Sequence, residues 1–147
     1  MRDSKTLMLN RNKRDADVHK GKWNGLGGKF ESGETPEECV SREVLEESGL
    51  KIESPQLAGL LSFPKFQDER DWYVYVFTAE EFSGSMSEND EGSLSWIDNS
   101  DVLTLELWEG DKIFLPWLFE KRFFSAMFKY EDGRLVDHSV SFYSLQS

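Results

Sequence analysis

The sequence contains little cysteine and no long apolar run, and each shortage excludes a class of protein. Cys39 is the only cysteine among 147 residues, so an intrachain disulfide is impossible and a reduced, intracellular setting is expected. We expect Cys39 to be a packing residue, since no histidine is paired with it by any pattern. The chain shows no signal peptide and no apolar segment long enough to span a membrane, so we expect a cytoplasmic protein without membrane contact.

Positive charge is also scarce. The chain has 17 Lys and Arg against 28 Asp and Glu, which gives a formal net charge of -11. Such a chain lacks the basic stripe that displaces counterions from a nucleic-acid backbone, which argues against a nucleic-acid polymer as partner. A small anionic ligand stays compatible if metal ions or local basic residues neutralise its site. The length predicts a single domain over residues 1–147, present as a monomer or homodimer.

The stretch Gly28–Leu50 carries the clearest local signals in the chain. Thr35 is a good N-cap, and Pro36 suits the first helical position. Glu38 stands three residues after Thr35 and completes a capping box. Gly49 is a typical C-terminal cap in the left-handed conformation. The sequence therefore predicts a helix that begins at Pro36 and ends before Gly49.

Three carboxylates share one face of this predicted helix. Glu43 and Glu47 stand at i and i+4, and Glu46 is three residues from Glu43. Arg42 is the only cation inside the helix, and Glu34 lies just upstream. One interpretation is a solvated acidic face. The other is a cluster of oxygen ligands for a hard divalent cation such as Mg²⁺ or Mn²⁺, and the gathering of carboxylates beside Arg42 favours it.

Two segments upstream of the helix suit contact with an anionic ligand. The polar segment before Trp23 is predicted to be a loop that is either solvated or makes phosphate contacts. Its basic residues are Arg11, Lys13, Arg14, His19, Lys20 and Lys22. The following segment 24–28 holds three glycines, which permit close approach of the backbone to a ligand.

Hydrophobic patterning predicts a mixed fold. Strands are expected at 6–9, at 57–66 with an interruption near Pro64, and at 71–77, 94–97, 123–130 and 135–142. A short helix with a loop is expected at 98–107, and an apolar helix at 112–121. This order of elements favours an α/β or α+β sandwich, and the absence of a G-x-G-x-x-G fingerprint argues against a dinucleotide-binding fold.

The stretch Gly28–Leu50 resembles, at every fixed position, the signature box of the Nudix hydrolases, G-x5-E-x7-R-E-U-x-E-E-x-G-U. A chance match is rarer than about one in 10⁸ starting positions at average composition. The segment WNGLGGK at 23–29 and the C-terminal segment WEGD…FFSAMFKYEDGRLVDHSVSFY are similar to the MutT branch. The resemblance implies an α/β/α sandwich around a mixed sheet. Relatives carry an apolar strand before the one that matches 6–9, so we expect that first strand to be missing or truncated here.

The resemblance also implies an activity. By analogy the protein hydrolyses oxidised purine nucleoside triphosphates such as 8-oxo-dGTP to the monophosphate and pyrophosphate. Such an enzyme removes oxidised nucleotides from the nucleotide pool and thereby protects DNA. The metal ion, Mg²⁺ or Mn²⁺, would be held by four carboxylates and one backbone carbonyl, those of Glu43, Glu46, Glu47, Glu91 and Gly27.

Catalytic roles carry over by position. Arg42 matches the arginine that orients the box glutamates, and Glu34 is its expected partner. Metal or a carboxylate activates the attacking water in such a site. Glu43 is the preferred general base, and Glu91 the second choice.

Residues outside the box are expected to bind substrate. Asn24, Trp108 and Asp111 align with purine-contacting residues, although core packing for Trp108 and a helix N-cap for Asp111 are equally compatible with the sequence. Gly110 stands where animal relatives carry a second aspartate. Two alternative functions stay open: a Nudix pyrophosphatase for another nucleoside diphosphate-X compound, such as an ordinary dNTP or ADP-ribose, and a non-catalytic nucleotide-sensing module.

Overall fold

The computed structural model of the chain describes residues 1, 4–10, 21–67, 69–87 and 93–144. The elements in chain order are β1 (Lys5–Asn10), β2 (Trp23–Asn24), α1 (Pro36–Ser48), β3 (Lys51–Glu53), β4 (Gln56–Gln67), β5 (Arg70–Thr78), β6 (Glu81–Ser83), β7 (Ser93–Asp98), η1 (Val102–Thr104), α2 (Glu109–Phe119), β8 (Phe123–Glu131) and β9 (Arg134–Tyr143). They group into two compact units: Met1–Pro55 with Ala79–Leu107, and Gln56–Thr78 with Trp108–Ser147. The expectation of one domain over 1–147 stays a prediction.

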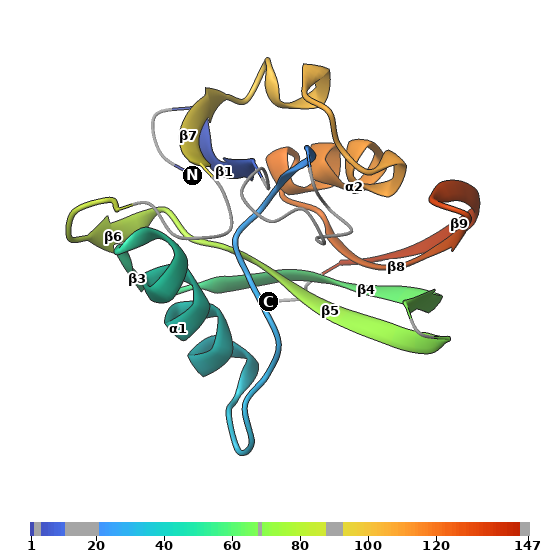
Figure 1. Cartoon of the computed structure of the whole chain (residues 1–147), viewed down its shortest axis with the longest axis horizontal. Coiled ribbons are helices and arrows are strands. Elements are labelled where there is room, and N and C mark those ends of the chain that lie inside the picture. The colour runs from blue at the N-terminus through green and yellow to red at the C-terminus, as the bar shows by residue number, and fades with distance from the viewer. Residues whose placement is uncertain (2–3, 11–20, 68, 88–92, 145–147) are drawn as a thin grey trace. The chain divides into compact units, whose positions relative to one another are not determined.

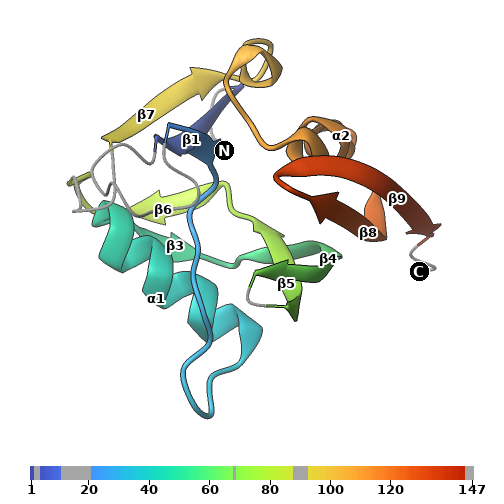
Figure 2. The same ribbon diagram turned by 45° about the vertical axis from the view of Figure 1, so that its right-hand side comes forward.

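The first unit combines helix α1 with two small antiparallel sheets. The larger has the order β2-β1-β7, and the smaller pairs β3 with β6. Figures 1 and 2 show β1 and β7 side by side, with Leu7 opposite Trp96 in the register. The pairing of β3 with β6 places Ile52 opposite Phe82 and ties the chain after α1 into the unit.

Helix α1 begins and ends as its capping signals predict. The Thr35 hydroxyl accepts the Glu38 N–H at 3.1 Å, and the Glu38 carboxylate accepts the Thr35 N–H at 3.0 Å. Gly49 has φ 80°, and its N–H donates to the Leu45 carbonyl. A Cβ at Gly49 would also lie 2.6 Å from the carbonyl oxygen of Ser85, so both conformation and space require glycine there.

The apolar side of α1 completes the core of the first unit. Val44 joins a buried cluster from β1, β7 and the chain after the helix, and burying each such side chain contributes about 1.5–3 kcal/mol. Its members are Leu7, Leu9, Val44, Leu50 and Leu94, with Leu26, Val40, Ile52, Phe82 and Trp96 packed against them. Ser48 is fully buried and satisfied, because its hydroxyl donates to the Val44 carbonyl and accepts the Leu50 N–H.

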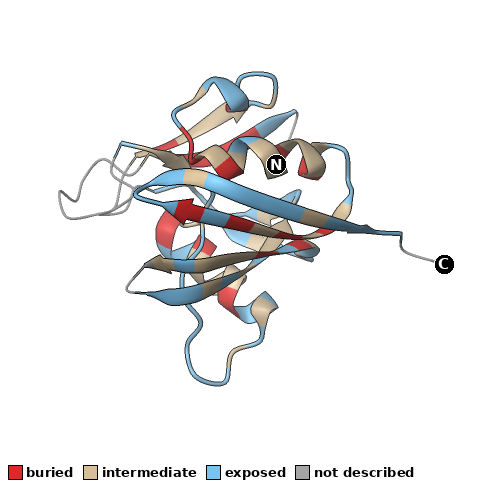
Figure 3. Cartoon of the chain, turned by 90° about the vertical axis from the view of Figure 1, so that its right-hand side faces the viewer, coloured by how far each residue is buried: buried red, intermediate tan, exposed pale blue. Residues whose placement is uncertain are grey.

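The second unit is a mixed sheet in the order β5-β4-β8-β9. Strands β4 and β8 run parallel, and the two outer pairs are antiparallel. Strand β8 alternates buried and less buried residues, whereas β9 is mostly exposed (Figure 3). The rings of Phe114 and Trp117 on α2 contact those of Phe124 and Phe128 on β8. Gly59 leaves room for Phe124, whose ring atoms would lie 2.5–2.6 Å from an added Cβ.

The structure confirms the predicted mixed α+β class and most of the expected elements, including the irregular register of β4 around Pro64. Three strands of two or three residues, β2, β3 and β6, were not predicted because such short segments show no periodicity. Helix α2 begins at Glu109, three residues earlier than expected. Within the described ranges, no helix is both long and apolar enough to cross a membrane.

Candidate functional site

Two carboxylates of α1 face the glycine-rich loop of the same unit. Glu43 and Glu47 are one helical turn apart and project toward successive glycines of the segment 24–28. The Gly27 N–H donates to Glu47 Oε2 at 2.9 Å. A Cβ at Gly28 would lie 2.5 Å from both carboxylate oxygens of Glu43, so only glycine allows this approach. The glycine-rich loop and helix α1 therefore bring Gly27, Glu43 and Glu47 together.

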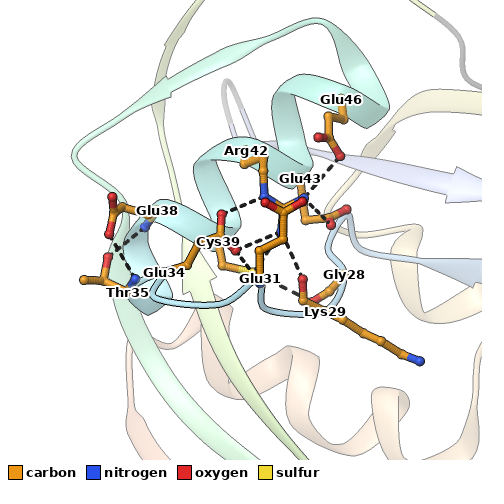
Figure 4. A network of polar contacts seen from close by, with 10 residues as sticks. All are labelled: Gly28, Lys29, Glu31, Glu34, Thr35, Glu38, Cys39, Arg42, Glu43 and Glu46. Carbon is orange, nitrogen blue, oxygen red and sulfur yellow. Dashed lines mark hydrogen bonds and ion pairs between the residues drawn. The ribbon is translucent and has the colours of Figure 1, made fainter.

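Arg42 connects three of the predicted carboxylates (Figure 4). Its Nε and Nη2 donate to the two oxygens of Glu34, at 2.6 and 3.0 Å, in a bidentate pair. Its Nη1 donates to Glu43 Oε1 at 2.8 Å and to Glu46 Oε2 at 3.2 Å. The expected pairing of Arg42 with Glu34 is present, and the guanidinium holds Glu43 and Glu46 on the same side of the helix.

Backbone groups of the loop before α1 complete this network, and no pattern in the sequence indicates them. Arg42 Nη2 also donates to the Lys29 carbonyl at 3.0 Å. The Glu31 N–H donates to Glu34 Oε1 at 2.7 Å (Figure 4). Arg42 and Glu34 therefore tie the loop to the helix in addition to arranging the carboxylates.

The network perturbs the charges of its members. Hydrogen bonds from Arg42, and then the backbone hydrogen bond from Glu31, lower the pKa of Glu34 from 4.5 to about 2. Hydrogen bonds to Glu34 and Glu43 raise the pKa of Arg42 above its usual value. Arg42 and Glu34 are therefore both ionised at every physiological pH.

Cys39 has a packing role in this region. It is buried, and burial raises the pKa of its thiol. Its Sγ lies 3.9 Å from the Gly28 carbonyl oxygen and 3.8 Å from Arg42 Nη2. A buried, neutral thiol is a poor nucleophile, in agreement with the expected packing role.

The chemistry of the cluster suits a hard divalent cation. Across the part of the chain that the structure describes, no three Asp, Glu, His or Cys side chains are already arranged to hold a metal ion. The carboxylates of Glu43 and Glu46 converge on Arg42 instead, yet Arg42 contacts only one oxygen of each. The available donors are all oxygens, and one guanidinium offsets part of their charge, so the residues fit Mg²⁺ or Mn²⁺.

Glu47 differs from the other helix carboxylates. It is only 7% exposed, so it lies on the buried edge of the acidic face. Its contact with the Gly27 N–H brings the Gly27 backbone, another predicted ligand, next to a carboxylate. Buried carboxylates require such partners, and a loop N–H and a metal ion are both suitable ones.

Other predicted residues lie away from the α1 network. In the first unit, Asn24 is on β2, and its side-chain amide makes a long 3.4 Å hydrogen bond to the Lys22 carbonyl. Lys22 is partly buried. Arg11 and Glu91, together with the basic residues at 13, 14, 19 and 20, lie outside the described residues.

Trp108 and Asp111 belong to the second unit, at the start of α2. Trp108 is buried and packs edge-on against Phe66 and Tyr130, which is compatible with core packing and leaves its contact with a base a prediction. Asp111 is the third residue of the helix, and its N–H donates to the Trp108 carbonyl. The N-cap alternative for Asp111 is therefore wrong, because the helix begins earlier and Trp108 is the N-cap.

Comparisons with known proteins identify the family of this chain. A family model, the NUDIX domain, matches residues 1–118. The oxidized purine nucleoside triphosphate hydrolase of Danio rerio is 34% identical over 121 residues, covering 82% of this chain and 78% of that protein. The protein of that name from Mus musculus is 35% identical over 112 residues, covering 76% and 72%.

A solved structure extends the agreement to the fold. The mutator MutT protein from Bacillus halodurans superposes with a TM-score of 0.83 at 32% identity, covering 95% of this chain and 92% of that one. It supports the expected Nudix-type fold across both units. With a family model matching residues 1–118 and a solved relative superposing over 95% of the chain, the chain belongs to the NUDIX domain family of hydrolases.

Proposed function

We propose that this protein hydrolyses oxidised purine nucleoside triphosphates, such as 8-oxo-dGTP, to the monophosphate and pyrophosphate. The single observation that carries the proposal is the Arg42 network, which gathers three of the four box carboxylates, those of Glu34, Glu43 and Glu46. Two relatives at 34–35% identity, both named oxidized purine nucleoside triphosphate hydrolase, support the substrate class. A sanitising role that protects DNA, a cytoplasmic location and a monomeric or homodimeric state belong to the same proposal.

Mg²⁺ is the proposed metal, with Mn²⁺ as a substitute. The carboxylates of Glu43, Glu46, Glu47 and Glu91 and the carbonyl of Gly27 would hold it. Bound metal would offset phosphate charge and lower the pKa of a water molecule. Arg42 pairs with Glu43 at 2.8 Å, and the chain carries a formal net charge of -11, so a bound cation would offset the charge of an anionic substrate at this acidic face.

The chain's own residues prepare the reaction by fixing the position of the base. Glu43 is the proposed general base, with Glu91 as the second candidate. Arg42 holds one oxygen of Glu43 at 2.8 Å, and the backbone at Gly28 limits movement of its carboxylate on the other side. A carboxylate restrained in this way loses little orientational freedom when it accepts a proton from water. Arg42 and Glu34 act as positioning residues through Glu43.

Substrate recognition is proposed for residues outside the network. Asn24 would bind the purine edge through its donor and acceptor atoms, Trp108 would stack on the base, and Asp111 would contact the purine edge. Arg11 and Lys22 would contact phosphates.

A nucleotide panel tests the proposal. The protein is incubated with Mg²⁺ and, separately, Mn²⁺, using 8-oxo-dGTP, the four ordinary dNTPs and ADP-ribose, and pyrophosphate is distinguished from orthophosphate. We expect the highest kcat/KM for 8-oxo-dGTP, with pyrophosphate as product. Much faster turnover of ordinary dNTPs or ADP-ribose would favour the general pyrophosphatase, and binding without turnover would favour a nucleotide sensor.

A further inference from the structure

Helix α2 begins without a local cap. Its N-cap is Trp108, which has extended backbone angles and makes no side-chain hydrogen bond to the helix. An indole has no acceptor, whereas the N–H groups of a first helical turn need acceptors from outside the helix. Trp108 therefore leaves N–H groups of the first turn for acceptors other than its own side chain.

Tyr130 on β8 supplies that acceptor. Its phenol oxygen accepts the Gly110 N–H at 2.6 Å, across 20 residues of chain. Both residues are buried, so water is a poor substitute for this hydrogen bond. Burial also raises the pKa of Tyr130 to about 12, so the phenol stays neutral. Tyr130 thus acts as a tertiary cap on the first turn of α2.

Gly110 is the residue that makes this contact possible. A Cβ at Gly110 would lie 2.8 Å from the Tyr130 oxygen and 3.0–3.1 Å from the Phe128 ring. Any side chain would displace the phenol or the helix. Gly110 and Tyr130 are therefore coupled: the glycine admits the hydroxyl, and the hydroxyl satisfies the glycine N–H.

The Tyr130 ring also sets the orientation of Trp108. The two rings meet edge-on, with centroids 5.5 Å apart and an interplanar angle of 81°. Phe66 contacts both rings at 5.5–5.6 Å, also edge-on. The Tyr130 ring therefore restrains Trp108. The Tyr130 hydroxyl restrains the following turn, which carries Asp111.

We propose that Tyr130 is a positioning residue for purine binding, which sets the spacing of Trp108 and Asp111 by capping Gly110. This inference rests on the proposed function, because Trp108 and Asp111 are the proposed purine contacts. It assigns the Gly110–Tyr130 pair a role in binding in addition to stability. The expected signature is an effect on KM and on purine preference rather than on kcat.

Tyr130→Phe tests the proposal because it removes one oxygen and keeps the ring. We expect KM for 8-oxo-dGTP to rise about five- to tenfold, with kcat within about twofold, as loss of one buried hydrogen bond would cause. The ratio of kcat/KM for 8-oxo-dGTP over dGTP should fall. Tyr73→Phe on the exposed face of β5 in the same unit is the matched control and should leave both parameters unchanged.

Gly110→Ala provides an independent second variant in case Tyr130→Phe folds poorly. It should raise KM as well, since the added Cβ meets the same hydroxyl. In the double variant the increase in KM should be smaller than the product of the two single increases. Tyr130→Phe removes the hydroxyl oxygen, which is the nearest atom to the Cβ that Gly110→Ala adds. Effects that multiply would overturn the proposed coupling.

The outcomes separate this inference from the function on which it rests. If the wild type turns over 8-oxo-dGTP but Tyr130→Phe matches Tyr73→Phe in KM and preference, the role of Tyr130 is refuted and the proposed function stands. If Tyr130→Phe lowers the melting temperature alone, its role is structural and the inference also fails. If the wild type does not act on oxidised purines, the proposed function fails first, and this inference fails with it.

Discussion

Gly28→Ala is the most direct probe of the carboxylate network, because it changes a loop residue and removes no charged group. The added Cβ would lie 2.5 Å from both oxygens of Glu43, whereas ordinary contacts begin near 3.4 Å. The Glu43 carboxylate must therefore retreat by about 1 Å, or the loop must move by the same amount. Retreat of Glu43 would break its 2.8 Å hydrogen bond to Arg42 Nη1 or distort it.

The size of the effect follows from that displacement. A misplacement of about 1 Å at a reacting group can cost about 10²-fold in rate, so we expect kcat/KM of Gly28→Ala to fall by about that factor. The fold should persist, because Gly28 is exposed and its φ is not in the left-handed region. A smaller substrate should not restore kcat/KM, because the displaced group would be the Glu43 carboxylate and not the substrate.

Steady-state hydrolysis of the best nucleotide, measured with a saturating Mg²⁺ series, reports the loss, and thermal unfolding reports the fold. Gly25→Ala is the matched control: it lies in the same loop, and nothing is within 4 Å of its added Cβ. Turnover of Gly28→Ala within about threefold of Gly25→Ala would refute the reasoning, because it would mean that Glu43 tolerates a shift of about 1 Å.

Three further predictions address single residues. Glu43→Gln should reduce kcat at least about 10²-fold with the fold intact, as removal of a general base does; near-wild-type turnover would exclude Glu43 as base. Asn24→Ala should change the ratio of kcat/KM between 8-oxo-dGTP and dGTP more than it changes kcat on the better substrate, and an equal loss on both would contradict a role in recognition. The pKa of Glu34 is about 2 in the folded protein against 4.5 ordinarily, so its carboxylate stabilises the fold above pH 4.5, and this contribution disappears as pH falls toward 2. The melting-temperature difference between wild type and Glu34→Gln should therefore shrink over that interval, and a constant difference would argue against the pair with Arg42.

Residues close in sequence were predicted well. The start and end of α1 depend on Thr35, Glu38 and Gly49, which act within one turn of the helix they cap. The sharing of one face by Glu43, Glu46 and Glu47 follows from helical geometry alone. For the same reason the hairpin of β8 and β9 was visible, since its turn lies between two patterned strands.

Helix α2 shows where local signals fail. Asp111 is a good N-cap residue by type, yet the helix begins at Glu109 with Trp108 as N-cap. The reason is a hydrogen bond from Gly110 to Tyr130, 20 residues away, which replaces the local cap. No periodicity or propensity in the segment 108–112 contains that information, because the acceptor comes from another strand.

The sequence alone determined the family, the capped helix and the set of carboxylates, because these depend on residue types at fixed short spacings. Only the tertiary structure decided which partner each carboxylate has: Glu47 is buried against the Gly27 N–H, Glu43 lies over Gly28, and Arg42 joins the Lys29 carbonyl to the helix. Such contacts depend on how a loop packs against a helix face. That packing is set by the whole core of the unit, so the spacing of residues along the chain does not encode it.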